Sequence, residues 1–356
     1  MTYVTLIKTI RPQSLGKNFE LSDSGTLIKN VVANISEGTT ITIAEVTPNR
    51  LKNILEKFAA RDDITLMPGR FVGEQPKAEA TLITQKNLAK KLDCLASDVP
   101  GGVQEIDGKR YVARIKPGIE PSDWIVIDAD NPEGIPDKWK ALNMQERLEL
   151  LEPLVAGIST CKRVEYRSSS ARVVKDGEQP GNASHAWLQI SDPAKMEVLR
   201  EHVKVNTQLK GLSFPSPRYS KETRQVIGHE PRTVIDLAVW VPGRLVFCSQ
   251  PVVWVDCFSV ADADIKIVNP DGGVLDVSAI ELPSGHDLKQ LQEKTGRVLS
   301  YSQNNGLKVS DTGTLTLDTL IEIKGVSKPL SEVVASVKPG DKVRCETPFR
   351  ASSSEA

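Results

Sequence analysis

The chain has 356 residues, of which 39% are hydrophobic and 26% are charged, so it can bury a sizeable core and we expect two or three domains. Its formal net charge of -1 gives no overall basic character, so any nucleic-acid surface has to be a local patch. The five cysteines form no CxxC pair, which argues against a zinc knuckle or a disulfide framework and favours a reducing cytoplasm. We expect no membrane association, because the N-terminus lacks a signal-peptide core and no stretch approaches the roughly 20 apolar residues that span a bilayer.

The first hundred residues combine short strands with two helices. Alternating apolar positions predict strands at 26–35 and 39–46. A threonine precedes an apolar 3.6-residue period at 47–61, which is typical of a capped helix, and a second helix is expected at 84–96. The segment QEIDGKRYVARI, residues 104–115, predicts a hairpin with Asp-Gly at its turn.

The segment DWIVIDAD, residues 123–130, is an apolar run that ends in two carboxylates spaced one residue apart. In a strand, residues i and i+2 point the same way, so Asp128 and Asp130 should project from one face. Two neighbouring carboxylates repel each other and resist desolvation, so such a pair normally requires a cation, and a hard divalent metal ion is the expected one. The alternative is a polar strand end that caps the following NPEG turn.

A Ser-rich segment and a histidine come next. The pattern predicts a helix at 144–158, a strand at 163–174 that is interrupted by three serines, a polar loop, a strand at 185–190 and a helix at 192–211. His185 begins the second of these strands, where a structural histidine is by itself the commoner interpretation. The serines Ser168 to Ser170 are equally compatible with a solvated turn.

The segment TVIDLAVWV has the alternation of a strand that is apolar on both faces except for Asp236. A buried unpaired carboxylate is costly enough that it is usually protonated, paired or bound to a metal ion. We therefore expect Asp236 either to join Asp128 and Asp130 or to form a salt bridge with Arg232 or Arg244.

Three motifs thus follow one another within about 120 residues, where h is a hydrophobic residue: an hhhDxD strand, a Ser-rich segment that ends in a His at the start of a strand, and an hhD strand. This order resembles the archaeo-eukaryotic primase superfamily, the primase-polymerases, over roughly residues 120–255. The matching residues are Asp128 and Asp130, His185 in NASHAWLQI and Asp236 in RTVIDLAVW, and the following PGRLVFCSQP resembles the same region in phage and plasmid primases. One position departs from the pattern: the family has Ser two residues before the His, where this chain has Ala183 followed by Ser184.

The resemblance implies a metal-dependent nucleotidyltransferase, a DNA primase and polymerase of a mobile element. Its partners would be a single-stranded DNA template and NTPs or dNTPs. Asp128, Asp130 and Asp236 would be the catalytic residues and would hold two Mg²⁺ or Mn²⁺ ions about 4 Å apart. His185 would contact the phosphates of the incoming nucleotide. The other candidate nucleotide contacts are Ser184, Ser168, Ser170, Arg172, Arg232 and Arg244, with Lys175 nearby in sequence.

The implied fold class is α+β, the archaeo-eukaryotic primase catalytic fold, with an RRM-like antiparallel sheet flanked by helices. We divide the chain into residues 1–115, an N-terminal α/β part of the catalytic unit, residues 116–265, the RRM-like part with the three motifs, and residues 266–356, a small accessory α+β module with a linker tail. A helix is expected at 284–299, and the tail at 338–356 resembles the start of the linker in larger primase-helicases. No GxxxxGK[ST] loop occurs, so a helicase domain or subunit would lie outside this chain.

Two other functions use the same residues. A two-metal phosphodiesterase or nuclease needs similar carboxylates but usually more His or Glu ligands, and the four histidines show no clustered ligand spacing. A replication-associated DNA-binding module without catalytic activity would use the carboxylates only structurally.

Overall fold

The computed structural model describes residues 2–22, 27–220, 223 and 225–295, and the short segments 298–302, 306–310, 320–323, 326–329, 344–346 and 353–355. The chain has an α+β fold, as predicted, and forms two compact units, Met1–Leu282 and Pro283–Ala356. No helix in the described ranges is long and apolar enough to cross a bilayer.

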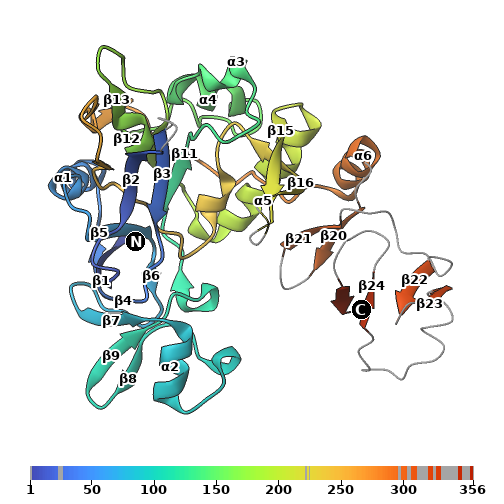
Figure 1. Cartoon of the computed structure of the whole chain (residues 1–356), viewed down its shortest axis with the longest axis horizontal. Coiled ribbons are helices and arrows are strands. Elements are labelled where there is room, and N and C mark those ends of the chain that lie inside the picture. Colours follow the sequence, from blue (N-terminus) through green and yellow to red (C-terminus); the bar gives the residue numbers. More distant parts are fainter. Residues whose placement is uncertain are drawn as a thin grey trace. The chain divides into compact units, whose positions relative to one another are not determined.

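A six-stranded sheet dominates the N-terminal part of the larger unit, at the lower left of Figure 1. Its strands, in spatial order, are β5 (Ile64–Pro68), β1 (Tyr3–Arg11), β4 (Glu37–Ala44), β7 (Glu79–Ile83), β9 (Lys109–Val112) and β8 (Gln104–Ile106). The predicted helices are confirmed as α1 (Pro48–Phe58) and α2 (Gln85–Leu92), each capped by a threonine side chain. The predicted hairpin is confirmed, since β8 and β9 pair antiparallel. Asp107 and Gly108 at its turn both have positive φ angles, 51° and 69°, as a tight hairpin turn requires.

A second sheet of four antiparallel strands carries the sequence motifs. Its strands, in spatial order, are β11 (Trp124–Asp128), β14 (Ser184–Gln189), β12 (Arg163–Arg167) and β19 (Lys266–Val268). The helices α4 (Met144–Leu151) and α5 (Met196–Leu209) belong to the core on one face of this sheet, with the short α3 (Asp137–Lys140) beside them. The side chains of β1, α1 and β5 pack on the other face, where they meet Trp124, Val126 and Trp187.

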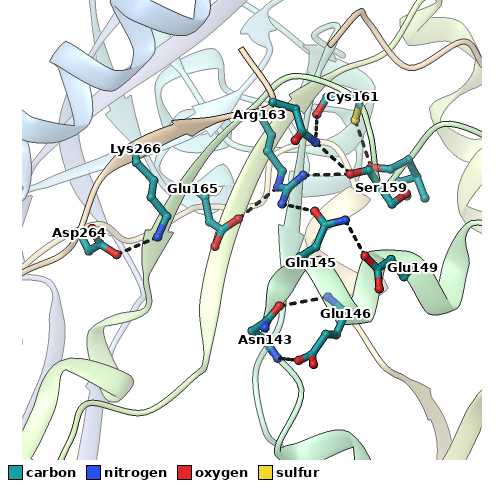
Figure 2. A network of polar contacts seen from close by, with 12 residues as sticks. Asn143, Gln145, Glu146, Glu149, Ser159, Cys161, Arg163, Glu165, Asp264 and Lys266 are labelled. Carbon is teal, nitrogen blue, oxygen red and sulfur yellow. Dashed lines mark hydrogen bonds and ion pairs between the residues drawn. The ribbon is translucent and has the colours of Figure 1, made fainter. Parts of the chain in front are cut away.

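A buried arginine joins α4 to the sheet, as Figure 2 shows. Arg163 of β12 donates to Gln145 of α4 at 2.7 Å, to the backbone of Ser159 at 3.2 Å and to Glu165 at 3.1 Å. A capping box formed by Asn143 and Glu146 fixes the first turn of α4.

Smaller elements complete the larger unit. A three-stranded sheet consists of β17 (Val252–Val253), β2 (Gly16–Leu21) and β3 (Leu27–Val32). The remaining paired strands are β6 (Arg70–Phe71) with β10 (Ile119–Glu120), β13 (Val173–Lys175) with β18 (Phe258–Val260), and β15 (Ser213–Tyr219) with β16 (Val226–Thr233). Single 3-10 turns are η1 (Ala96–Asp98), η2 (Lys116–Gly118), η3 (Ser169–Arg172), η4 (Pro193–Lys195) and η5 (Leu237–Trp240).

The smaller unit contains α6 (Gly285–Thr295) and short strands. These strands are β20 (Val298–Ser302) with β21 (Gly306–Ser310), and a sheet of β23 (Val326–Pro329), β22 (Leu320–Ile323), β24 (Arg344–Glu346) and β25 (Ser353–Glu355). The helix expected at 284–299 thus ends at Thr295 within the described residues. Most of the tail predicted as a linker, 338–356, lies outside the described residues.

Two predictions about the larger unit are wrong. Residues 266–282 do not belong to an accessory module, because β19 is the edge strand of the motif-bearing sheet and Leu275 and Val277 are buried in its core. The strand predicted at 233–241 does not form. The observed strand β16 ends at Thr233, and the residues after it lead into the 3-10 turn η5. The apolar residues of this segment lie along the edge of β11 and against α5 instead of within a sheet, with Val234, Ile235 and Trp240 buried and Ala238 exposed.

Candidate functional site

Asp128 and His185 lie directly opposite each other in the β11–β14 pair and project from the same face of the sheet. Their side chains approach to 3.4 Å between Oδ1 and Nε2, an ion pair when the imidazole is protonated. The contact lacks hydrogen-bond geometry, so the buried Oδ1 of Asp128 has no hydrogen-bond donor among the described residues. Burial acts to raise the pKa of Asp128, but His185 and Lys17 outweigh this effect and hold that pKa below its ordinary value.

Tyr166 of β12 fixes the histidine from the other side. Its hydroxyl lies 3.1 Å from Nδ1 of His185, and the two rings meet edge to face with centroids 5.2 Å apart. Burial raises the pKa of Tyr166 well above its ordinary value, so the phenol stays protonated and can donate to Nδ1. Nε2 of His185 is thereby directed toward Asp128.

Asp236 lies at the free edge of β11. Its backbone N–H donates to the Asp128 carbonyl at 2.8 Å, and further along the same edge the Trp240 indole donates to the Val126 carbonyl at 2.7 Å. One carboxylate oxygen of Asp236 accepts from the N–H of Ala238 at 2.8 Å and so caps η5. Burial, together with the charges of Asp128 and Asp130, raises the pKa of Asp236.

A buried arginine that the sequence analysis missed holds the two carboxylate loops together. Nη1 of Arg147 donates to the carbonyls of Asp130 and Val234, both at 2.9 Å. Nη2 donates to the Asn131 side chain and to the Trp139 carbonyl. The signal for this residue was present in the sequence, because Arg147 shares the buried face of α4 with leucines and a methionine.

Lys17 is the second residue that the sequence analysis missed. It comes from β2, and its Nζ donates to Ser170 Oγ at 3.1 Å, which in turn lies 3.4 Å from Ser168 Oγ. Burial and the neighbouring Lys29 lower the pKa of Lys17, while the charges of Asp130 and Asp128 oppose them. No local pattern could reveal this residue, because more than a hundred residues separate it from the first motif.

The other predicted nucleotide contacts are divided. Ser168 and Ser170 lie beside Lys17. Arg232 is paired with Glu230 at 2.9 Å, and its charge also acts on Asp236, where it partly opposes the rise in the pKa of that carboxyl group. Ser184 points to the opposite face from His185, as neighbours in a strand must, and lines a separate cavity of about 210 Å³. Among the contacts of the described residues, none joins Arg172 or Arg244 to the carboxylates. Arg172 donates to the Ala261 carbonyl instead, and Arg244 is exposed.

The three carboxylates suit a hard divalent ion by chemistry but are not a preformed metal centre. Within the described ranges, no three His, Cys, Asp or Glu side chains converge on one point. A bound cation would pair with the free oxygen of Asp128, and it would offset both the burial and the neighbouring negative charges that raise the pKa of Asp236. Oxygen ligands from carboxylates are those that Mg²⁺ and Mn²⁺ prefer.

The raised pKa of Asp236 predicts a specific dependence of stability on pH. A carboxyl group whose pKa is higher in the folded than in the unfolded protein weakens the fold as pH rises through these two values. In a metal chelator, Asp236→Asn should therefore melt at a higher temperature than the wild type at pH 7, and the difference should disappear below the ordinary Asp value of 3.8. Asparagine keeps the cap on Ala238, so thermal unfolding from pH 3 to 7 isolates the charge. Equal melting temperatures at pH 7 would contradict the expectation.

Comparisons of the chain with models of protein families, with curated proteins and with solved structures return no match.

Proposed function

We propose that this protein is a metal-dependent, template-directed nucleotidyltransferase of the primase-polymerase type, which makes or extends primers on single-stranded DNA. The observation that carries the proposal is the meeting of three separate sequence motifs at the end of β11. His185 faces Asp128 across one side of the strand, and Asp236 is hydrogen-bonded to Asp128 on the other. A four-stranded antiparallel sheet flanked by helices, α4 and α5 on one face and α1 on the other, also supports the RRM-like catalytic fold of that family.

The three carboxylates have the charge and ligand type that nucleotidyl transfer requires. In this reaction the 3′-oxygen forms a bond to the α-phosphorus, the bond from that phosphorus to the bridging oxygen breaks, pyrophosphate leaves, and the hydroxyl proton passes to solvent. Mg²⁺ or Mn²⁺, when bound by Asp128, Asp130 and Asp236, supplies the positive charge that favours both the attacking and the leaving oxygens. Arg147 keeps the loops of these residues at a fixed separation.

Three polar residues lie on the Asp128 side of the cluster: His185 and Lys17 act on Asp128, and Ser170 lies beside Lys17. Lys17 and Ser170 are joined by a hydrogen bond, and both Lys17 and His185 act electrostatically on Asp128. Donors that surround a carboxylate cluster suit a ligand that brings both phosphates and metal ions. We assign the triphosphate of the incoming nucleotide to this side of the cluster.

The test is nucleotide incorporation on a single-stranded template, with and without a primer, with NTPs or dNTPs and with Mg²⁺ or Mn²⁺. Incorporation that is abolished by a chelator and restored by the ion is the expected result. Cleavage of the template without incorporation would instead indicate a phosphodiesterase. Binding of DNA without either reaction would indicate a non-catalytic module, and both outcomes would refute the proposal.

Lys17→Met should raise the KM for the nucleotide about tenfold or more, because it removes a cation from the triphosphate side and keeps most of the side-chain volume. Lys8→Met is the matched control, since Lys8 is exposed on β1. Steady-state kinetics with saturating primed template measure the effect. A change in kcat alone, with the KM unaltered, would contradict the assignment of Lys17 to phosphate binding.

A further inference from the structure

A cavity of about 340 Å³ lies beside the carboxylate cluster, between α5, β16 and η5. Asp130 and Asp236 line it, whereas Asp128, His185 and Lys17 are not among the described residues that do so. Its volume falls within the range of ~300–1,000 Å³ that is typical of small-molecule sites. The carboxylates therefore have two different surroundings: Asp128 lies with His185 and Lys17, whereas Asp130 and Asp236 line this cavity.

The wall of the cavity carries three basic side chains, each of which is already paired. Arg200 and Lys204 of α5 both contact the buried carboxylate of Glu201, at 2.9 and 3.4 Å, and Arg232 contacts Glu230. Arg200 also contacts Glu197 at 2.7 Å, yet its buried Nε has no hydrogen-bond partner in the described part of the chain. Such a wall offers hydrogen-bond donors but little net positive charge, which suits a phosphodiester better than a triphosphate.

Apolar side chains line another part of the cavity. They come from the segment that follows β16, and they are Ile235, Leu237, Ala238 and Val241. Surfaces of this kind pack against the face of a base or a sugar. The cavity thus combines two metal-ligating candidates, an apolar surface and paired cations.

We infer that this cavity holds the terminal nucleotide of the strand being extended, which supplies the attacking 3′-hydroxyl. The inference rests on the proposed function. In an in-line displacement the attacking and leaving oxygens lie on opposite sides of the phosphorus, so the strand end and the triphosphate need separate spaces beside the same carboxylates. The Lys17 side has the donors for the triphosphate, and the cavity has the paired cations and apolar surface for a strand end.

Two variants test the inference. Ala238→Leu adds bulk to an exposed position of the cavity, and Lys204→Gln removes one charge while Arg200 remains paired with Glu201. Ala238→Leu should raise the KM for the primer about tenfold, and Lys204→Gln about threefold, with the nucleotide KM at saturating primer within twofold of the wild type. Lys210→Gln, at the exposed C-terminal end of α5, is the matched control and should change neither constant.

A direct binding measurement accompanies the kinetics. A labelled primer-template with a 3′-dideoxy end cannot react, so fluorescence anisotropy reports its Kd alone. This Kd should rise in the two cavity variants and stay constant in Lys17→Met. Thermal unfolding verifies that Ala238→Leu is folded, and Lys204→Gln changes only a partly exposed side chain, so a folding defect in one leaves the other informative.

The outcomes separate the inference from the proposed function. An active wild-type enzyme whose cavity variants raise the nucleotide KM instead of the primer KM, or alter neither, overturns the inference alone. A wild-type protein that incorporates no nucleotide under any condition overturns the proposed function, and the inference with it.

Discussion

Nucleotide incorporation should fall about 10³-fold or more in Asp236→Asn and Asp128→Asn. Each change removes one negative charge from the proposed ion site, and stabilisation by a metal ion that amounts to about 4 kcal/mol corresponds to that factor. Asparagine is nearly isosteric with aspartate, and in Asp236→Asn its oxygen can still accept from the N–H of Ala238. The loss should therefore occur in kcat, in a protein that remains folded.

Asp62→Asn is the control for this prediction, because Asp62 is exposed and lies outside the candidate site. Primer extension in Mg²⁺ and in Mn²⁺ is the measurement, with thermal unfolding recorded for each variant. If Asp236→Asn is both more stable at pH 7 and inactive, the charged Asp236 side chain lowers the stability of the fold and is required for activity. Retention of more than a tenth of the wild-type rate by either variant would remove that residue from the proposed metal site.

Arg147→Met should destabilise the larger unit by about 3–5 kcal/mol, the usual cost of removing one partner from a buried charged network. The guanidinium is fully buried, and its loss leaves the carbonyls of Asp130, Val234 and Trp139 without their donor. It also removes a positive charge that acts on Asp128 and Asp130. The folded fraction should consequently be less active, because Arg147 joins the two carboxylate loops through the carbonyls of Asp130 and Val234.

Arg163→Met is the matched control, since Arg163 is equally buried and hydrogen-bonded, but its contacts are Gln145, Ser159 and Glu165, and it joins α4 to β12 (Figure 2). Both variants should lose stability in chemical denaturation. Only Arg147→Met should also lose activity when the rates are corrected for the folded fraction. Equal residual rates per folded molecule would show that Arg147 has a purely structural role.

Local sequence patterns were sufficient for the elements whose formation depends on neighbouring residues. The capped helices α1 and α2 and the hairpin of β8 and β9 follow from a threonine cap, an apolar period and an Asp-Gly turn. The strands β11 and β14 follow from apolar runs between turn residues, and their pairing places Asp128 opposite His185. The strand predicted around Asp236 was wrong, because a partly buried helical turn made of apolar residues has the same composition as a buried strand.

The sequence by itself determined that this is an α+β protein, and it identified Asp128, Asp130, His185 and Asp236 as residues whose charge needs a partner. Only the tertiary structure decided which side chains surround them. It brings Lys17 from β2 to the carboxylates and turns Ser184 to the other face of the sheet. It also places Arg147 between the two carboxylate loops. Backbone hydrogen bonds and capping act within a few residues and can be recognised in the chain, whereas burial and electrostatic contacts depend on which distant segments pack together.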